Sequence, residues 1–103
     1  MFNFLNMRPY EQRNVDYYHK GKLDIDTSEV PDGSSPFETG IRHPDYNYGE
    51  WIIVEAYNNR ENAQSGHNRW VESMAILPDE LTDCANSFLV QCLEKQTFER
   101  VRS

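Results

Sequence analysis

The segment from Phe37 to Met74 constrains the fold more than any other part of the chain. It begins with an alternating apolar and polar pattern over residues 37–43, which is typical of a strand with one buried face. After a short loop, an apolar run over residues 50–57 predicts a strand that is covered on both faces. Residues 58–74 then place apolar side chains at helical spacing behind a capping asparagine, either Asn58 or Asn59. The segment therefore predicts a compact β-β-α unit.

The residues before this unit predict a first hairpin. Leu23, Ile25 and Thr27 alternate with aspartates, which is typical of a strand with one face in water. An extended segment over residues 13–18 and a glycine turn would complete the hairpin. Two prolines and an Asp-Gly pair within residues 30–36 then break the chain before the second hairpin begins.

The residues after the unit predict a second helix over residues 79–100. Asp79 and Glu80 stand at its start, where the helix dipole favours negative charge. Its apolar positions cover roughly half of the helix circumference; they are Leu81, Cys84, Ala85, Phe88, Leu89, Cys92 and Leu93. A band this wide predicts a helix that is buried between two layers or that pairs with another copy of the chain.

These patterns predict one α+β domain over residues 1–103. We expect a small antiparallel sheet of three or four strands, arranged as two hairpins and packed by two C-terminal helices. Residues 1–12 are expected to form an irregular arm. Gly66 has no side chain, which would let the first helix approach the sheet closely.

Composition narrows the classes of partner. The chain has 103 residues, a formal net charge of −7 and no stripe of basic residues. Nucleic acid is therefore a poor direct partner, because phosphate binding depends on clustered Lys and Arg. An acidic surface suits a basic patch on another macromolecule. We expect no signal peptide and no membrane span, and two cysteines eight residues apart on a helix predict free thiols in a cytoplasm.

Three motifs in the β-β-α unit carry a resemblance to known proteins. They are Phe-Glu-Thr-Gly-Ile at 37–41, Ile-Val-Glu-Ala-Tyr at 53–57 and Ala-x-x-Gly-His-x-x-Trp-Val at 63–71. In this order they resemble small uncharacterised proteins of tailed bacteriophages and prophages. The resemblance implies a viral gene in a bacterial host and a compact α+β domain, and it implies no catalytic residue.

Thr39 and His67 are the expected polar residues of the core. His67 lies on the apolar face of the predicted first helix, and Thr39 lies on the inward face of a strand. Buried polar groups need hydrogen-bond partners, so we interpret this pair as structural. The alternative is a small enzyme in which His67 and Glu38 perform acid-base chemistry in a cleft. Glu38 lies on the strand face opposite Thr39, which favours the structural interpretation.

Trp51, Ile53 and Tyr57 are the expected partner-binding residues. Their alternating positions place them on one face of the doubly apolar strand. Aromatic residues with aliphatic neighbours are typical of the centres of protein interfaces. The alternative is that the N-terminal arm or the C-terminal helix of the same chain covers them.

The sequence contains no motif for a metal, a cofactor or a catalytic nucleophile. It has no Cys-x-x-Cys, no pair of histidines three or four residues apart, and no phosphate-binding glycine loop. We therefore predict a non-enzymatic phage accessory protein in the host cytoplasm, which binds a protein such as a host or defence factor. The alternatives are a virion component or homodimer, and the small enzyme centred on His67.

Overall fold

The computed structural model describes residues 10–30, 35–84 and 96–101. Its elements follow the chain in this order: α1 (Tyr10–Arg13), β1 (Asn14–Lys20), β2 (Leu23–Glu29), β3 (Phe37–Arg42), the 3-10 turn η2 (Asn47–Gly49), β4 (Ile52–Tyr57), α2 (Arg60–Ser73), β5 (Glu80–Asp83) and β6 (Gln96–Glu99). Residues 1–9 of the predicted arm lie outside the described ranges, and residues 10–13 form the short helix α1.

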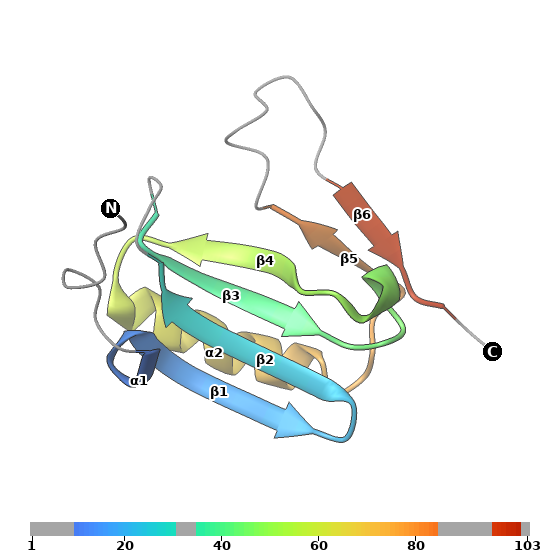
Figure 1. Cartoon of the computed structure of the whole chain (residues 1–103), viewed down its shortest axis with the longest axis horizontal. Helices are drawn as coiled ribbons and strands as arrows, with labels where there is room; N and C mark the ends of the chain where they lie inside the picture. The colour runs from blue at the N-terminus through green and yellow to red at the C-terminus, as the bar shows by residue number, and fades with distance from the viewer. Residues whose placement is uncertain (1–9, 31–34, 85–95, 102–103) are drawn as a thin grey trace, which may run out of the picture.

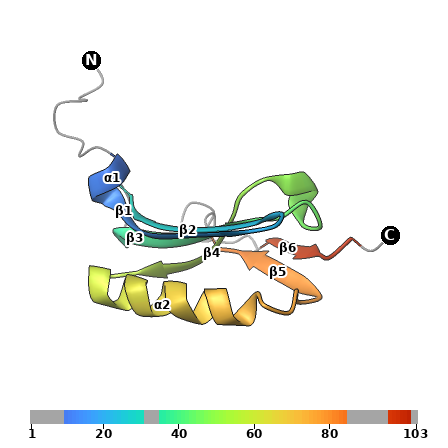
Figure 2. The same cartoon turned by 90° about the horizontal axis from the view of Figure 1, so that it is seen from below.

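Strands β1 to β4 form one antiparallel sheet in chain order, and α2 lies across one face of it (Figures 1 and 2). The predicted α+β class and the antiparallel sheet are confirmed, and the sheet has four strands. In the described part of the chain no second layer covers the opposite face, which we call the outer face. The turn η2 rises on the outer side of the sheet (Figure 2).

The helix begins where local chemistry predicts. Asn59 is the N-cap, and its side chain accepts a hydrogen bond of 2.8 Å from the backbone N–H of Asn62. The main core lies between α2, the sheet and β5. Alternation along β2 and β3 directs its aliphatic side chains inward. The buried members are Leu23, Ile25, Ile41, Tyr46, Ile52, Met74 and Leu81.

A β-bulge divides β4 into two registers. Thr39 pairs with Glu55, yet its neighbour Gly40 pairs with Ile53, so β4 has one extra residue at this point. We expected Tyr57 to share a face with Ile53, and that expectation is wrong because the bulge reverses the alternation. Tyr57 therefore faces α2, where its side chain is only 6% exposed.

The predicted second helix over residues 79–100 is wrong. Its two ends are strands, since β5 and β6 form an antiparallel pair, while residues 85–95 lie outside the described ranges. The backbone N–H of Cys84, which follows β5, donates to the carbonyl of Ile53 in β4 at 2.8 Å. The β5–β6 pair therefore lies beside the edge of β4. At residues 80–83 and 96–99 the hydrogen bonds between the strands outweigh the local preference for a helix.

Within the ranges that the structure describes, no helix has the length and apolar composition required to cross a membrane.

Candidate functional site

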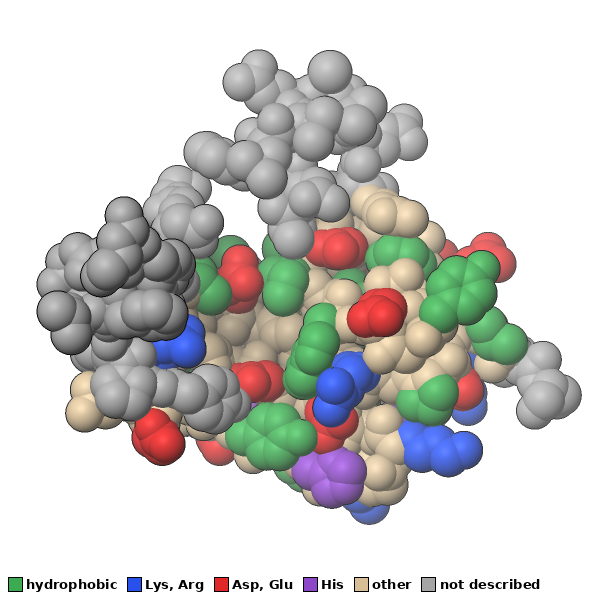
Figure 3. Space-filling view, viewed as in Figure 1, with side chains coloured by type: hydrophobic (Ala, Val, Ile, Leu, Met, Phe, Trp, Pro, Cys, Tyr) green, Lys and Arg blue, Asp and Glu red, His purple; other side chains and the backbone are tan. Residues whose placement is uncertain are grey.

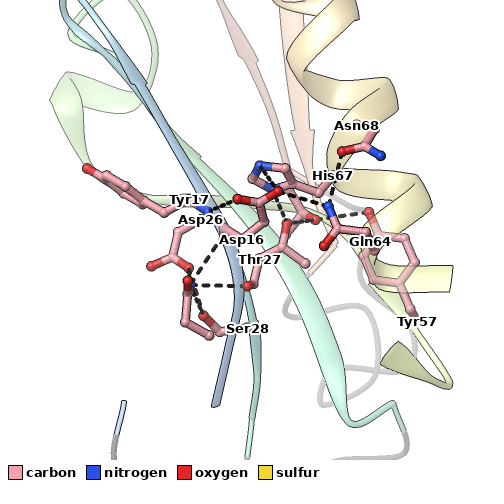
Figure 4. Close-up of polar contacts among 11 residues, drawn as sticks. Asp16, Tyr17, Asp26, Thr27, Ser28, Tyr57, Gln64, His67 and Asn68 are labelled. Atoms are coloured by element: carbon pink, nitrogen blue, oxygen red, sulfur yellow. Dashed lines mark hydrogen bonds and ion pairs between the residues drawn. The ribbon is translucent and has the colours of Figure 1, made fainter. Parts of the chain in front are cut away.

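A chain of hydroxyl groups crosses the interior between the sheet and α2. The hydroxyl of Thr27 lies 2.7 Å from Nδ1 of His67 and 2.6 Å from the hydroxyl of Thr39. The Thr39 hydroxyl lies 3.0 Å from the Tyr57 hydroxyl, which in turn donates to Glu55 at 3.0 Å. Figure 4 shows His67 reaching Thr27 from α2. We call these five residues the hydroxyl chain.

The carboxylate at one end sets the direction of every hydrogen bond. Burial opposes ionisation of Glu55, but hydrogen bonds from Trp70 and Tyr57 and the charge of Arg69 hold its pKa below the ordinary value. An ionised carboxylate only accepts hydrogen bonds, so Tyr57 must be the donor. Burial raises the pKa of Tyr57 to about 12, so its proton stays in place.

Counting protons then assigns the tautomer of His67. Because the proton of Tyr57 goes to Glu55, Tyr57 accepts from Thr39, and Thr39 accepts from Thr27. Each threonine has one proton to donate, so Thr27 has none left for the imidazole. His67 must therefore donate from Nδ1 to Thr27.

The other nitrogen of His67 faces β1. Its Nε2 lies 3.9 Å from Oδ2 of Asp16, and Gln64 donates to the same oxygen at 2.9 Å (Figure 4). The hydrogen bond from Gln64 holds the pKa of Asp16 below its ordinary value. Burial lowers the pKa of His67 against the opposing charges of Asp16 and Asp26, which favours the neutral imidazole.

The order Asp16, His67, Thr27 is that of an acid, a base and a hydroxyl nucleophile in a hydrolase. The exposure does not suit that chemistry, because Thr27 is 0% exposed and His67 is 2% exposed. A substrate cannot reach either group in this conformation. Glu38, the predicted acid partner, belongs to β3 and lines a hollow on the outer face, whereas its neighbour Thr39 is on the His67 side of the sheet. The geometry suits a clamp between α2 and the sheet.

The outer face carries a second polar group, centred on Asp24. Its carboxylate receives a hydrogen bond of 2.6 Å from Tyr17 and lies 2.6 Å from Nδ1 of His19. Arg42 donates to the same carboxylate at 2.9 Å, and its guanidinium lies 4.6 Å from the ring centre of Trp51. Asp24 therefore links β1, β2 and β3 and orients a cation against an aromatic ring.

Trp51 and Ile53 pack closely over Gly40, which has no side chain. A Cβ atom at Gly40 would come within 3.2 Å of the Trp51 ring and 3.4 Å of Ile53. Beside them is a hollow of about 290 Å³, to which three acidic residues contribute. They are Asp26, Glu29 and Glu38. Arg13 also lines it, so the hollow combines an apolar wall with three carboxylates and one guanidinium.

Replacing Asp24 with asparagine is expected to lower the free energy of unfolding at pH 7 by about 1–2 kcal/mol, a value reduced for screening on the outer face. Hydrogen bonds from Tyr17, His19 and Arg42 lower the Asp24 pKa from 3.8 to about 2. As the pH falls, the Asp24 carboxylate therefore binds a proton in the unfolded chain before it does so in the folded protein. The stability that Asp24 contributes is present above pH 3.8 and is lost as the pH falls to about 2.

Urea denaturation between pH 2 and pH 7 would measure this effect. Glu72→Gln is the matched control, because it removes one exposed carboxylate from α2. If the Asp24 and Glu72 variants lost the same stability at pH 7, the network around Asp24 would have no stabilising role.

The structure brings two of the three predicted partner-binding residues together. Trp51, 37% exposed, and the half-buried Ile53 share the outer face, whereas Tyr57 is inside the hydroxyl chain. Thr39 and His67 lie on the same side of the sheet, but Thr27 stands between them. Thr27 follows Leu23 and Ile25 at the same two-residue spacing. This spacing in the sequence could have identified Thr27 as another inward-facing residue of β2.

The cluster around Asp24 was not predicted, because it joins residues from three strands. Within residues 10–30, 35–84 and 96–101 no three His, Cys, Asp or Glu side chains are placed to hold a metal ion.

Comparison of this chain with protein-family models, with curated proteins and with solved structures found no match. The resemblance to phage proteins stays a prediction.

Proposed function

We propose that this chain is a phage-encoded accessory protein that binds another protein through the outer face. One observation carries the proposal: Trp51 lies across Gly40 with the Arg42 guanidinium packed on its ring, on the side of the sheet away from α2. Trp and Arg are the residues most enriched at the energetic centres of interfaces. Their fixed arrangement reduces the entropy lost on binding.

The charge of the face indicates the chemistry of the partner. Figure 3 shows apolar side chains among acidic and basic groups on this side of the molecule. The hollow beside Trp51 has three acidic residues and one arginine in its wall, so acidic groups are in excess there, and the whole chain has a formal charge of −7. A protein with a basic surface patch and an apolar residue at its centre would complement both features. A host or defence factor in the host cytoplasm is the partner we favour.

The alternatives have less support from the geometry. A homodimer or virion component was predicted partly from a wide apolar helix, and the described ends of that segment are strands. A small enzyme centred on His67 needs that imidazole to meet a substrate, and its burial argues against this. Self-association through the outer face is therefore an outcome to be tested with the binding experiment.

The double variant Trp51→Ser with Ile53→Ser is expected to weaken partner binding by about 10- to 100-fold, since two central interface residues are lost. Tagged protein would be incubated with lysate of bacterial cells, and retained proteins would be identified by mass spectrometry. Any retained protein would then be purified and its affinity for both forms measured.

Ile76→Ser is the matched control, because Ile76 is an exposed aliphatic residue that follows α2 instead of lying on the sheet. It should bind like the unaltered chain. Equal binding by the double variant would contradict the proposal. Light scattering of all three forms would show whether the face instead joins two copies of the chain.

A further inference from the structure

We propose that the hollow between η2 and β6 binds an arginine side chain from an extended segment of a protein. The site uses none of the outer-face residues described above, so it does not depend on the proposed function. The hollow has a volume of about 840 Å³. Three residues with apolar surface and two glutamates carry the argument: Pro44, Tyr48, Val101, Glu80 and Glu99.

Tyr48 extends into solvent from a turn whose backbone has an unusual conformation. Asn47, Tyr48 and Gly49 all have left-handed φ angles, of 50°, 54° and 81°. This region is sterically unfavourable for a tyrosine, and such residues persist only where the surroundings hold them. The Tyr48 side chain is nevertheless 96% exposed, so its own packing does not explain the conformation.

The residues around Tyr48 hold the turn in place. The N–H of Gly49 donates to the carbonyl of Tyr46 at 3.0 Å, and the N–H of Glu50 donates to the carbonyl of Asn47 at 2.9 Å. Tyr46 is fully buried, and its hydroxyl donates to the carbonyl of Pro78. The exposed ring is therefore attached to a loop that is fixed to the core. A ring presented in this way loses little backbone freedom when it binds.

The two glutamates place like charges opposite each other. Glu80 of β5 and Glu99 of β6 are direct cross-strand partners, so their side chains leave the same face of the pair. Neither carboxylate makes a hydrogen bond or an ion pair with any residue that the structure describes. The nearby guanidinium of Arg100 is instead bound to Asp45 at 3.1 Å. A cation between the two carboxylates would relieve their repulsion.

Arginine fits this combination better than lysine. Its planar guanidinium can bind carboxylates with two parallel hydrogen bonds and can stack on a tyrosine ring. Its aliphatic stem would lie against the exposed Pro44 and Val101, which also line the hollow. The hollow is thus complementary in charge and in apolar surface to an arginine that is flanked by apolar residues.

A nuclear magnetic resonance titration tests this site directly. The probe is the capped tripeptide Leu-Arg-Val, and the matched control is Leu-citrulline-Val, which keeps the shape of arginine but has no charge. We expect saturable shifts at the amides of Tyr48, Glu80 and Glu99 with the arginine peptide. The citrulline peptide should bind about ten-fold more weakly or not at all.

Three protein variants separate the possible results. Glu80→Gln with Glu99→Gln and, separately, Tyr48→Ala alter exposed side chains, and both variants should lose arginine binding with an unchanged fold. Trp51→Ser with Ile53→Ser should keep it, because those residues lie outside the hollow. Equal binding of both peptides, shifts confined to other residues, or no saturable shift would each overturn the proposal.

Discussion

Replacing Gly66 with alanine is expected to destabilise the protein by about 3 kcal/mol, although alanine is the better helix former by about 1 kcal/mol. A Cβ atom at this position would lie 2.2 Å from the Tyr57 hydroxyl and 2.3 Å from its ring. Real atoms cannot approach so closely, so either α2 or the buried ring must move. Moving the ring also breaks the hydrogen bonds to Thr39 and Glu55. Thermal and urea denaturation would measure the loss.

The neighbouring Ser65→Ala is the matched control, since Ser65 is exposed on α2 and lies outside this contact. It should leave stability unchanged or slightly higher. Tyr57→Leu makes room at Gly66, so Gly66→Ala should cost much less in that background. A double-mutant cycle with no coupling between the two positions would show that the ring does not limit the approach of the helix.

Replacing His67 with alanine is expected to cost about 3 kcal/mol, because it leaves a cavity and removes the donor to Thr27. Asparagine can place its amide N–H near the position of Nδ1, so His67→Asn should lose only about 1.5 kcal/mol. Glutamine places its amide nearer to Nε2 and should be the worse replacement. The ranking tests whether the hydrogen bond at Nδ1 is the one that stabilises the fold, as well as the structural role of His67.

The pH dependence of stability provides an independent check on His67. Its pKa is below the ordinary 6.5 in the folded protein because burial disfavours the imidazolium. Below pH 6.5 the unfolded chain therefore binds the proton more readily, and stability falls as the pH decreases through this range. The His67 variants should not show this His67-dependent fall in stability below pH 6.5. Unchanged melting temperatures in His67→Ala would instead remove the structural assignment.

Alternation and capping were enough to locate the sheet and the first helix. Leu23, Ile25 and Thr27 point inward as their period of two requires, and the helix is capped by Asn59, one of the two asparagines predicted as its cap. The need for a small residue at Gly66 was also visible in the sequence. These features depend on neighbours within a few residues, so the sequence states them directly.

The bulge in β4 could not be predicted in the same way. It depends on how β4 pairs with β3 at Gly40, and that pairing is chosen by the packing of both strands. One extra residue moved Tyr57 from the predicted binding face to the helix side. The sequence therefore placed Trp51 and Ile53 correctly on one face of the sheet, and placed Tyr57 on that face incorrectly.

The C-terminal strands show the same limit more strongly. The apolar spacing after Pro78 favours a helix locally, but residues 80–83 pair with residues 96–99 and continue from the edge of β4. The cluster around Asp24 and the facing glutamates at 80 and 99 also arise only when distant strands come together. Local spacing and capping thus defined the elements of the central unit. Strand register and long-range pairing determined which faces meet and which side chains remain available for binding, because those contacts join residues that are far apart in the chain.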